Sequence, residues 1–140
     1  MPDQLVTRIL VNIDVDDLER ATRFYTEAFG LRVGRRFAEP WRELLGPGVQ
    51  IYLLEKKPGT SATIDTVRAR DYQRHWTPVH LDFVVPSIGA AIERAVRAGA
   101  KVERDVVDEP YGRLALLADP FGHGFCFIEF NAQGYDAPGT

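Results

Sequence analysis

Two stretches of sequence decide the fold: LVNIDVDDL at residues 10–18 and HLDFVVPSI at residues 80–88. They share one pattern at an offset of 70 residues, which is half of the 140-residue chain. Each stretch begins with apolar residues at every second position, the signature of a half-buried strand. Each then runs into a helical pattern. A repeat of this length predicts two similar modules.

The expected helices follow these strands directly. The first opens at Asp16 or Asp17 and ends before Gly30, and the second opens at Ser87 and ends at Gly99. Asp and Ser are favoured N-cap residues, and Gly is the commonest residue after a helix end. Each helix must cover the apolar face of its strand, so the mixed faces point away from the helices. These faces carry Leu10, Asn12 and Asp14 in the first strand and His80, Asp82 and Val84 in the second.

Further strand-like stretches complete each half, and they predict an α+β fold. They cover residues 31–37, 42–45 and 49–55, then 101–107, 113–118 and 124–130. We therefore expect two βαβββ modules forming a curved mixed sheet cup, with the helices on the outer face. The single domain would comprise module one (about 5–56), a linker (about 57–77), module two (about 78–131) and a tail (132–140) without regular structure. One unit alone leaves half of its sheet face unpaired, so the two combine either within the chain or across a homodimer.

Composition excludes several classes of function. Charged residues make up 26% of the chain and the net charge is −3, with basic residues interleaved among acids, so we expect no nucleic-acid partner. Every apolar run is far shorter than the roughly 18 residues of a membrane span. The first residues lack the apolar core of a signal peptide, so a cytoplasmic protein with no membrane partner is expected. A single cysteine, Cys126, excludes an internal disulfide.

A set of landmarks in the sequence resembles the vicinal-oxygen-chelate superfamily, which holds the glyoxalases, bleomycin-resistance proteins and extradiol dioxygenases. In the first half they are VDDLERA (15–21), FY (24–25) and FGL (29–31). In the second half they are HLDFVV (80–85), AGA (98–100) and DPFGHG (119–124). Together they span nearly the whole chain in the family's order.

The resemblance implies one divalent metal held by four ligands from the first and last strands of each half. Carried over by position, these sites are Leu10, Tyr52, His80 and Cys126, where the family usually has His or Glu. His80 is an ordinary metal ligand and Cys126 suits zinc, but Leu10 cannot coordinate an ion. We therefore expect no cofactor. The alternative is a divalent metal (Zn, Ni, Fe or Mn) anchored on His80.

Other donors share the mixed faces but suit a metal poorly. The donors that could in principle substitute as ligands are Asn12, Asp14 and Asp82. Neighbouring same-face residues on a strand lie about 7 Å apart, so we expect His80 and Asp82 to share one ion only if they bend toward each other. Glu55 and Glu129 are repeat partners that fall on the opposite face. Cys126 is interpreted as a small buried residue, because a reactive thiolate would need a neighbour such as His80 to lower its pKa.

The leading hypothesis is a protein that binds a small organic molecule on the concave face without turnover, as the bleomycin-resistance proteins do. Arg113 would pair with an acidic group of the ligand. The alternative is a metal-dependent glyoxalase-like lyase or isomerase, or a ring-cleaving dioxygenase, with His80 as anchor ligand and catalytic residue. A third reading is an interaction module without a ligand. The expected ligand-binding residues are Leu10, Asn12, Tyr52, His80, Asp82, Arg113 and Cys126.

Overall fold

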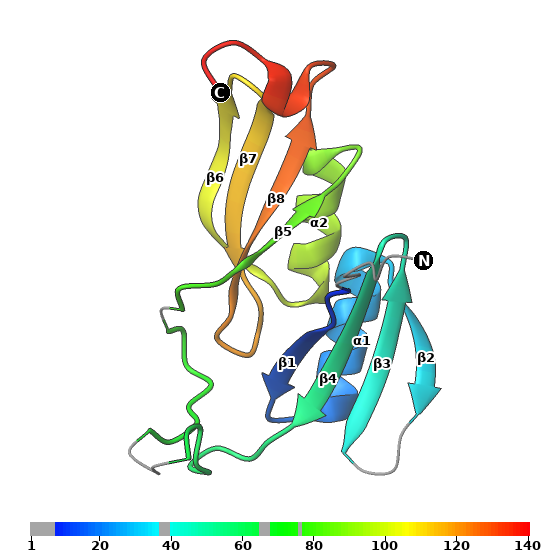
Figure 1. Ribbon diagram of the computed structural model, residues 1–140, viewed down its shortest axis with the longest axis vertical. Helices are drawn as coiled ribbons and strands as arrows, with labels where there is room; N and C mark the ends of the chain where they lie inside the picture. The colour runs from blue at the N-terminus through cyan, green and yellow to red at the C-terminus, as the bar shows by residue number, and fades with distance from the viewer. Residues whose placement is uncertain (1–7, 37–39, 65–67, 76) are drawn as a thin grey trace, which may run out of the picture.

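Two four-stranded sheets, each with its own helix, make up the computed structural model, which describes residues 8–36, 40–64, 68–75 and 77–140 (Figure 1). Module 1 contains β1 (Val11–Val15), α1 (Leu18–Phe29), β2 (Arg32–Arg36), β3 (Trp41–Gly46) and β4 (Val49–Glu55). Module 2 contains β5 (Leu81–Val84), α2 (Ile88–Ala98), β6 (Lys101–Glu109), β7 (Gly112–Ala118) and β8 (Gly124–Phe130). The strand orders, β1-β4-β3-β2 and β5-β8-β7-β6, are the same. The predicted α+β fold with two βαβββ modules is confirmed.

In both sheets the first strand pairs with the last in parallel, and the other pairs are antiparallel. This arrangement places β1 and β5 at one edge of their sheets. The expected end of one strand at Phe37 and the expected start of module one at residue 5 lie outside the described residues. No helix in the described part of the chain has the length and apolarity to cross a membrane.

The helix ends lie where the sequence predicts them. Asp17 is the N-cap of α1 and Ser87 is the N-cap of α2, and each side chain accepts a hydrogen bond from the backbone N–H three residues later. Gly30 follows α1 in the left-handed conformation, with φ of 68°. Gly99 follows α2 with φ of 120°, where a side chain would strain the backbone.

The end of the last strand in each module also holds the start of its helix. Glu55 accepts a hydrogen bond from the backbone N–H of Leu18 at 3.2 Å. Glu129 accepts one from the N–H of Ile88 at 2.8 Å. These carboxylates satisfy a donor that has no partner within the helix and place negative charge at its positive end. Their position on the helix side of each sheet agrees with the sequence pattern.

A single core joins the two modules. The helices pack against each other, and the buried cluster takes apolar residues from both sheets (Figure 1). At the seam, Phe29 at the end of α1 stacks on Phe83 of β5, with ring centroids 3.9 Å apart. Arg94 of α2 donates a hydrogen bond to the carbonyl of Ala28 at 3.2 Å. The helix-facing sides of both sheets are therefore buried, and the other faces point away from the helices.

The tail differs from the expectation of no regular structure. One turn of 3₁₀ helix, η1, covers Gly134–Asp136. The Asn131 side chain accepts hydrogen bonds from the backbone N–H groups of Gln133 and Gly134, which fixes the turn. The ring of Tyr135 then packs edge-to-face against Phe130, with centroids 4.8 Å apart. Local side-chain bonds and aromatic packing thus order a segment that has no periodic pattern.

Candidate functional site

One row of residues crosses the open face of the module 2 sheet. Strand register places Asp82 of β5 beside Cys126 of β8, Cys126 beside Leu116 of β7, and Leu116 beside Arg104 of β6. Paired residues on neighbouring strands project to the same side of a sheet. The row therefore presents a carboxylate, a thiol, an apolar side chain and a guanidinium in sequence.

His80 adds a third donor at the Asp82 end of this row. The Nε2 atom of His80 lies 3.2 Å from Oδ1 of Asp82, and these side chains are 54% and 40% exposed. One ligand atom from each of His80, Asp82 and Cys126 lies within 4.8 Å of the others. From the sequence, these two residues are expected to share an ion only if their side chains bend toward each other, and in the structure the two side chains do approach each other.

The Cys126 thiol is held in its protonated form. Burial raises its pKa to about 11, and the charge and hydrogen bond of Asp82 add to the effect. The more distant charge of Arg104 acts in the opposite direction. Because the thiolate is the reactive species, this site does not favour nucleophilic chemistry at neutral pH. The interpretation of Cys126 as a small buried residue fits this environment.

A pocket of about 330 Å³ lies over Cys126, Leu116 and Arg104 of this row and is bordered by His80 at the other end, within the size range of small-molecule sites. Arg74 of the linker borders it, and its guanidinium makes two hydrogen bonds to Glu103, at 2.7 and 3.0 Å. Arg104 is exposed and borders the pocket, and among the described residues its side chain has no ion pair. The lining residues are Arg74, Thr77, His80, Arg104, Leu116, Gly124 and Cys126.

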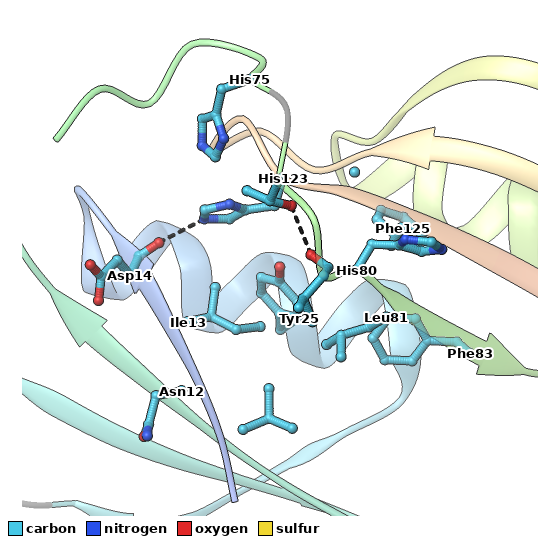
Figure 2. A pocket seen from close by; sticks show the side chains of 14 residues that line it. Asn12, Ile13, Asp14, Tyr25, His75, His80, Leu81, Phe83, His123 and Phe125 are labelled. Carbon is cyan, nitrogen blue, oxygen red and sulfur yellow. Dashed lines mark hydrogen bonds between the residues drawn. The ribbon is translucent and has the colours of Figure 1, made fainter. Parts of the chain in front are cut away.

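A second pocket, of about 460 Å³, lies at the seam between β1 and β5 (Figure 2). All three histidines of the chain, His75, His80 and His123, line it. The Nε2 atom of His123 lies 2.8 Å from the backbone oxygen of Asp14. A carbonyl can only accept, so Nε2 carries the proton in this contact. The rings of His75 and His123 meet edge-to-face, with centroids 5.4 Å apart.

A buried carboxylate, Asp119, hydrogen-bonds to two of the residues that line the seam pocket, Tyr25 and His123. Asp119 accepts a hydrogen bond from the hydroxyl of Tyr25 at 2.5 Å and two more from the backbone N–H groups of Phe121 and His123. Burial and the adjacent Asp119 charge raise the pKa of Tyr25 well above its ordinary value. The β7–β8 turn is thereby fixed against α1. Because these groups are hydrogen-bonded to one another, we interpret them as fixing the turn in place and not as reactive groups.

Module 1 carries the equivalent row on the face of its sheet that points away from α1. We call it the closed row, because its carboxylate is hydrogen-bonded within the module. Asn12 pairs with Tyr52, and Tyr52 pairs with Glu43. The Tyr52 hydroxyl donates to Glu43 at 2.8 Å, and the backbone N–H of Arg35 donates to the same carboxylate at 2.9 Å. These two bonds, that of Arg35 first, lower the pKa of Glu43. A Cβ on Gly34 would lie 2.5 Å from Oε1 of Glu43, so the carboxylate folds over the glycine.

Three of the predicted site residues, His80, Asp82 and Cys126, come together. Tyr52 and Asn12 share the other sheet, where the Tyr52 hydroxyl is bound to Glu43. Leu10 lies before β1 and is 46% exposed. Arg113 is paired with Glu129, on the helix-facing side of the second sheet, and its nearest acid is Asp108 at 3.7 Å. The structure thus separates Arg113 from the pocket that it was expected to line.

Glu43, Arg104 and His123 were not among the residues expected at the site. Glu43 lies within β3, a stretch whose sequence has no clear alternation, and its contact with Tyr52 depends on a register that the sequence does not reveal. Arg104 lies in a strand whose register shifts on both sides of it, which breaks the period of two. The contact of His123 with Asp14 spans 109 positions of sequence, and the landmark DPFGHG at residues 119–124 was the one local signal near it.

Comparison with known proteins gives one family model that matches most of the chain, described as a glyoxalase-like domain, over residues 10–128. The anthracycline biosynthesis protein DauV from Streptomyces sp. (strain C5) is 31% identical over 127 residues, which cover 91% of this chain and 42% of DauV. The chain therefore spans less than half the length of this curated relative.

Solved structures with the same fold include two proteins of stated ligand chemistry. A mutant of the fosfomycin resistance protein FosX from Listeria monocytogenes, complexed with Mn(II) and 1S,2S-dihydroxypropylphosphonic acid, gives a TM-score of 0.70 at 17% identity and covers 93% of this chain and 94% of its own. The antibiotic binding protein TnmS3 from Streptomyces sp. CB03234 gives a TM-score of 0.65 at 19% identity, covering 92% of this chain and 100% of its own. At these identities the likeness shows the fold.

Proposed function

The chain belongs to the glyoxalase-like domain family, and from this premise we propose that it binds a small organic molecule on the open face of module 2, without the family's four-ligand metal centre. The observation that carries the proposal is the pocket that extends from His80 across Cys126 and Leu116 to Arg104. Hydrogen-bonding groups stand at one end, an apolar side chain in the middle and a cation at the other end. Concave sites of this mixed kind bind small molecules.

The relatives support a ligand with rings and oxygen substituents. DauV is named for anthracycline biosynthesis and TnmS3 for antibiotic binding, and both are similar to this chain over nine-tenths of its length. The seam pocket adds aromatic walls from Phe83 and Phe125 beside the polar cluster. Because His80, Thr77 and Gly124 border both pockets, one ligand can extend from the first into the second.

The residues at the ligand-equivalent positions do not fit the family's metal centre. Leu10 has no donor atom, and the hydroxyl of Tyr52 is bound to Glu43. The remaining pair, His80 and Cys126, lies in the other module with a thiol whose pKa is raised to about 11. A thiol also has to lose its proton before it binds an ion. These features favour a ligand held without metal.

A fluorescence titration with N-phenyl-1-naphthylamine in the presence of EDTA tests this function. We expect saturable binding of one probe per chain. Leu116→Trp fills the pocket with an apolar side chain and should remove at least nine-tenths of the signal, whereas Val96→Trp on the exposed side of α2 should not. Circular dichroism would show that both variants fold.

Two results would contradict the proposed function. One is a wild-type protein that does not bind the neutral probe saturably. The other is a Leu116→Trp variant that folds and binds the probe as well as the wild type. Either result would mean that the face of module 2 is not a binding site.

A second candidate function follows from one specific observation, the close approach of His80, Asp82 and Cys126. Imidazole, carboxylate and thiolate together would hold a borderline ion such as zinc with a coordination position left open. The ion would polarise a substrate oxygen, as in a glyoxalase-type lyase or isomerase. A dioxygenase fits less well, because its iron triad needs two histidines and a carboxylate, and among the described residues the donor group contains one histidine.

Competition with a chromogenic chelator separates the two candidates. The leading proposal predicts that zinc binds more weakly than about 10 μM, because the His80 and Asp82 side chains are 54% and 40% exposed and water competes with them for the ion. Stoichiometric zinc that is lost in both His80→Ala and Cys126→Ala would favour the metal-dependent enzyme instead. Cys126→Ala also tests whether the thiol is a ligand or only a packed side chain.

We also propose a homodimer. Strands β1 and β5 are edge strands within the described part of the chain, and Ile9, Leu10, Val79 and Val84 near them are 78%, 46%, 76% and 61% exposed. Open edges flanked by apolar side chains favour pairing with a second copy. Light scattering after gel filtration should give twice the monomer mass of 15.7 kDa. A monomer at micromolar concentration would contradict this proposal.

A further inference from the structure

We propose that Arg104 binds an acidic group of the ligand, so that the molecule taken by this site is an amphipathic organic anion. The inference rests on the proposed function and names the chemical class of its ligand. The acidic group would lie at Arg104, an apolar body over Leu116, and hydroxyl or amine groups at His80, the polar residue at the other end of the pocket. Three arguments from the structure support it.

The first argument is the difference between two arginines that border the same pocket. Arg74 is neutralised by two hydrogen bonds from its guanidinium to Glu103. Arg104 makes no ion pair with any described residue and is exposed on the pocket side of the sheet. A guanidinium forms a planar pair of donors that matches a carboxylate, sulfonate or phosphonate. Of the two, Arg104 is the cation that remains available to a ligand.

The second argument is the backbone around Arg104. The pairing of β6 with β7 shifts register between Val102 and Arg104 and again between Arg104 and Val107. Such irregularities bend a strand and redirect a side chain, and they are common next to binding sites. Here Arg104 keeps its pairing with Leu116 between two shifts. Its side chain therefore stays in the row that ends at Asp82.

The third argument is the spacing of the row. Arg104 and Asp82 lie on the two outer strands of a four-stranded sheet, so their Cα atoms are separated by three strand spacings, or about 14 Å. Leu116 and Cys126, both uncharged, lie between them. A cation and a carboxylate at this separation do not neutralise each other. Because His80, which lies 3.2 Å from Asp82, borders the pocket, His80 and Arg104 fit the two polar ends of one ligand with an apolar centre.

A matched pair of probes tests the inference. 8-Anilinonaphthalene-1-sulfonate carries a sulfonate, and N-phenyl-1-naphthylamine has the same rings without it. In about 0.15 M salt, which screens distant charges, we expect Arg104→Gln to raise the Kd of the sulfonate about tenfold and that of the neutral probe less than twofold. Arg104→Lys should recover most of the loss. Arg97→Gln, which removes an exposed charge at the end of α2, should change neither Kd.

The outcomes distinguish this inference from the function on which it rests. Failure of the wild-type protein to bind the neutral probe overturns the proposed function and the inference with it. Normal binding of the neutral probe, combined with equal losses for both probes in Arg104→Gln, overturns the inference alone. So does an Arg104→Gln variant with an unchanged Kd for the sulfonate. Selective loss of the sulfonate, recovered by lysine, supports it.

Discussion

The two modules share one scaffold but use the open faces of their sheets differently. In module 1 the row Asn12–Tyr52–Glu43 is closed, because Glu43 accepts from both the Tyr52 hydroxyl and the Arg35 backbone. In module 2 the corresponding row begins at Asp82 and ends at Arg104, with a pocket above its last three members, Cys126, Leu116 and Arg104. Polar groups that pair within a sheet stabilise it, and unpaired groups at a pocket recognise ligands. A repeat can thus divide structure and binding between its halves.

The hairpins of the two modules differ in the same way. The β3–β4 turn of module 1 is a tight turn around Pro47 and Gly48, and Pro47 is exposed. The β7–β8 turn of module 2 is longer and reaches across the seam, where Asp119 accepts a hydrogen bond from Tyr25 of α1. The longer hairpin therefore holds the modules together, while the shorter one connects its own strands.

The largest predicted effect is on this hairpin. Asp119→Ala removes the acceptor of a hydroxyl and two backbone N–H groups, and at about 1 kcal/mol each it should lower the free energy of unfolding by about 3 kcal/mol. Tyr25→Phe removes one of these bonds and should cost about 1 kcal/mol. Urea unfolding at pH 7 measures both. Pro47→Ala on the equivalent turn should cost less than about 1 kcal/mol, and equal losses for Asp119→Ala and Pro47→Ala would remove the distinction between the hairpins.

A smaller effect is predicted for the closed row of module 1. Glu43→Gln offers one acceptor oxygen where two donors converge, so it should lower the melting temperature by a few degrees at pH 7. The folded-state pKa of Glu43 is lowered, so its contribution is complete above the unfolded value of about 4.3 and is lost as pH falls through the folded value. The difference in melting temperature between the wild type and Glu43→Gln should therefore disappear toward pH 3.

The same variant sharpens the comparison of the two faces. Glu43→Gln should bind N-phenyl-1-naphthylamine within twofold of the wild-type Kd, because the closed row stabilises module 1. A variant that kept its melting temperature but lost the probe would show that module 1 contributes binding groups. If the melting temperatures still differed at pH 3, the charge of Glu43 would not be the cause of the lower stability of the variant.

Much of the scaffold could be predicted because its signals are local. Asp17 and Ser87 cap helices through bonds to residues three positions away, and the glycines after each helix follow from backbone geometry alone. The alternation in residues 10–18 and 80–88 separated the helix-facing side from the open side of β1 and β5. His80 and Asp82 were therefore placed on the side of their strand that faces away from the helix, as the structure has Asp82.

The remaining features of the site depend on contacts between distant strands. The pairing of Glu43 with Tyr52 and of Arg104 with Leu116 requires the register of two hairpins, which no local pattern gives. Arg113 was proposed as a ligand-binding residue without an assigned face, and register places it beside Glu129. The convergence of His80 and Asp82 depends on side-chain rotamers, which backbone spacing cannot predict.

Alkylation of Cys126, the single cysteine of the chain, tests the central claim that the ligand lies on the face of module 2. Because the pKa of this thiol is raised to about 11, its reaction with iodoacetamide should be slow at pH 7 and about a hundredfold faster at pH 9. The rate at pH 9 would be followed by intact-protein mass spectrometry with and without saturating N-phenyl-1-naphthylamine. We predict at least tenfold slower alkylation with the probe bound. An unchanged rate, with the probe shown to be bound by its fluorescence, would contradict the claim.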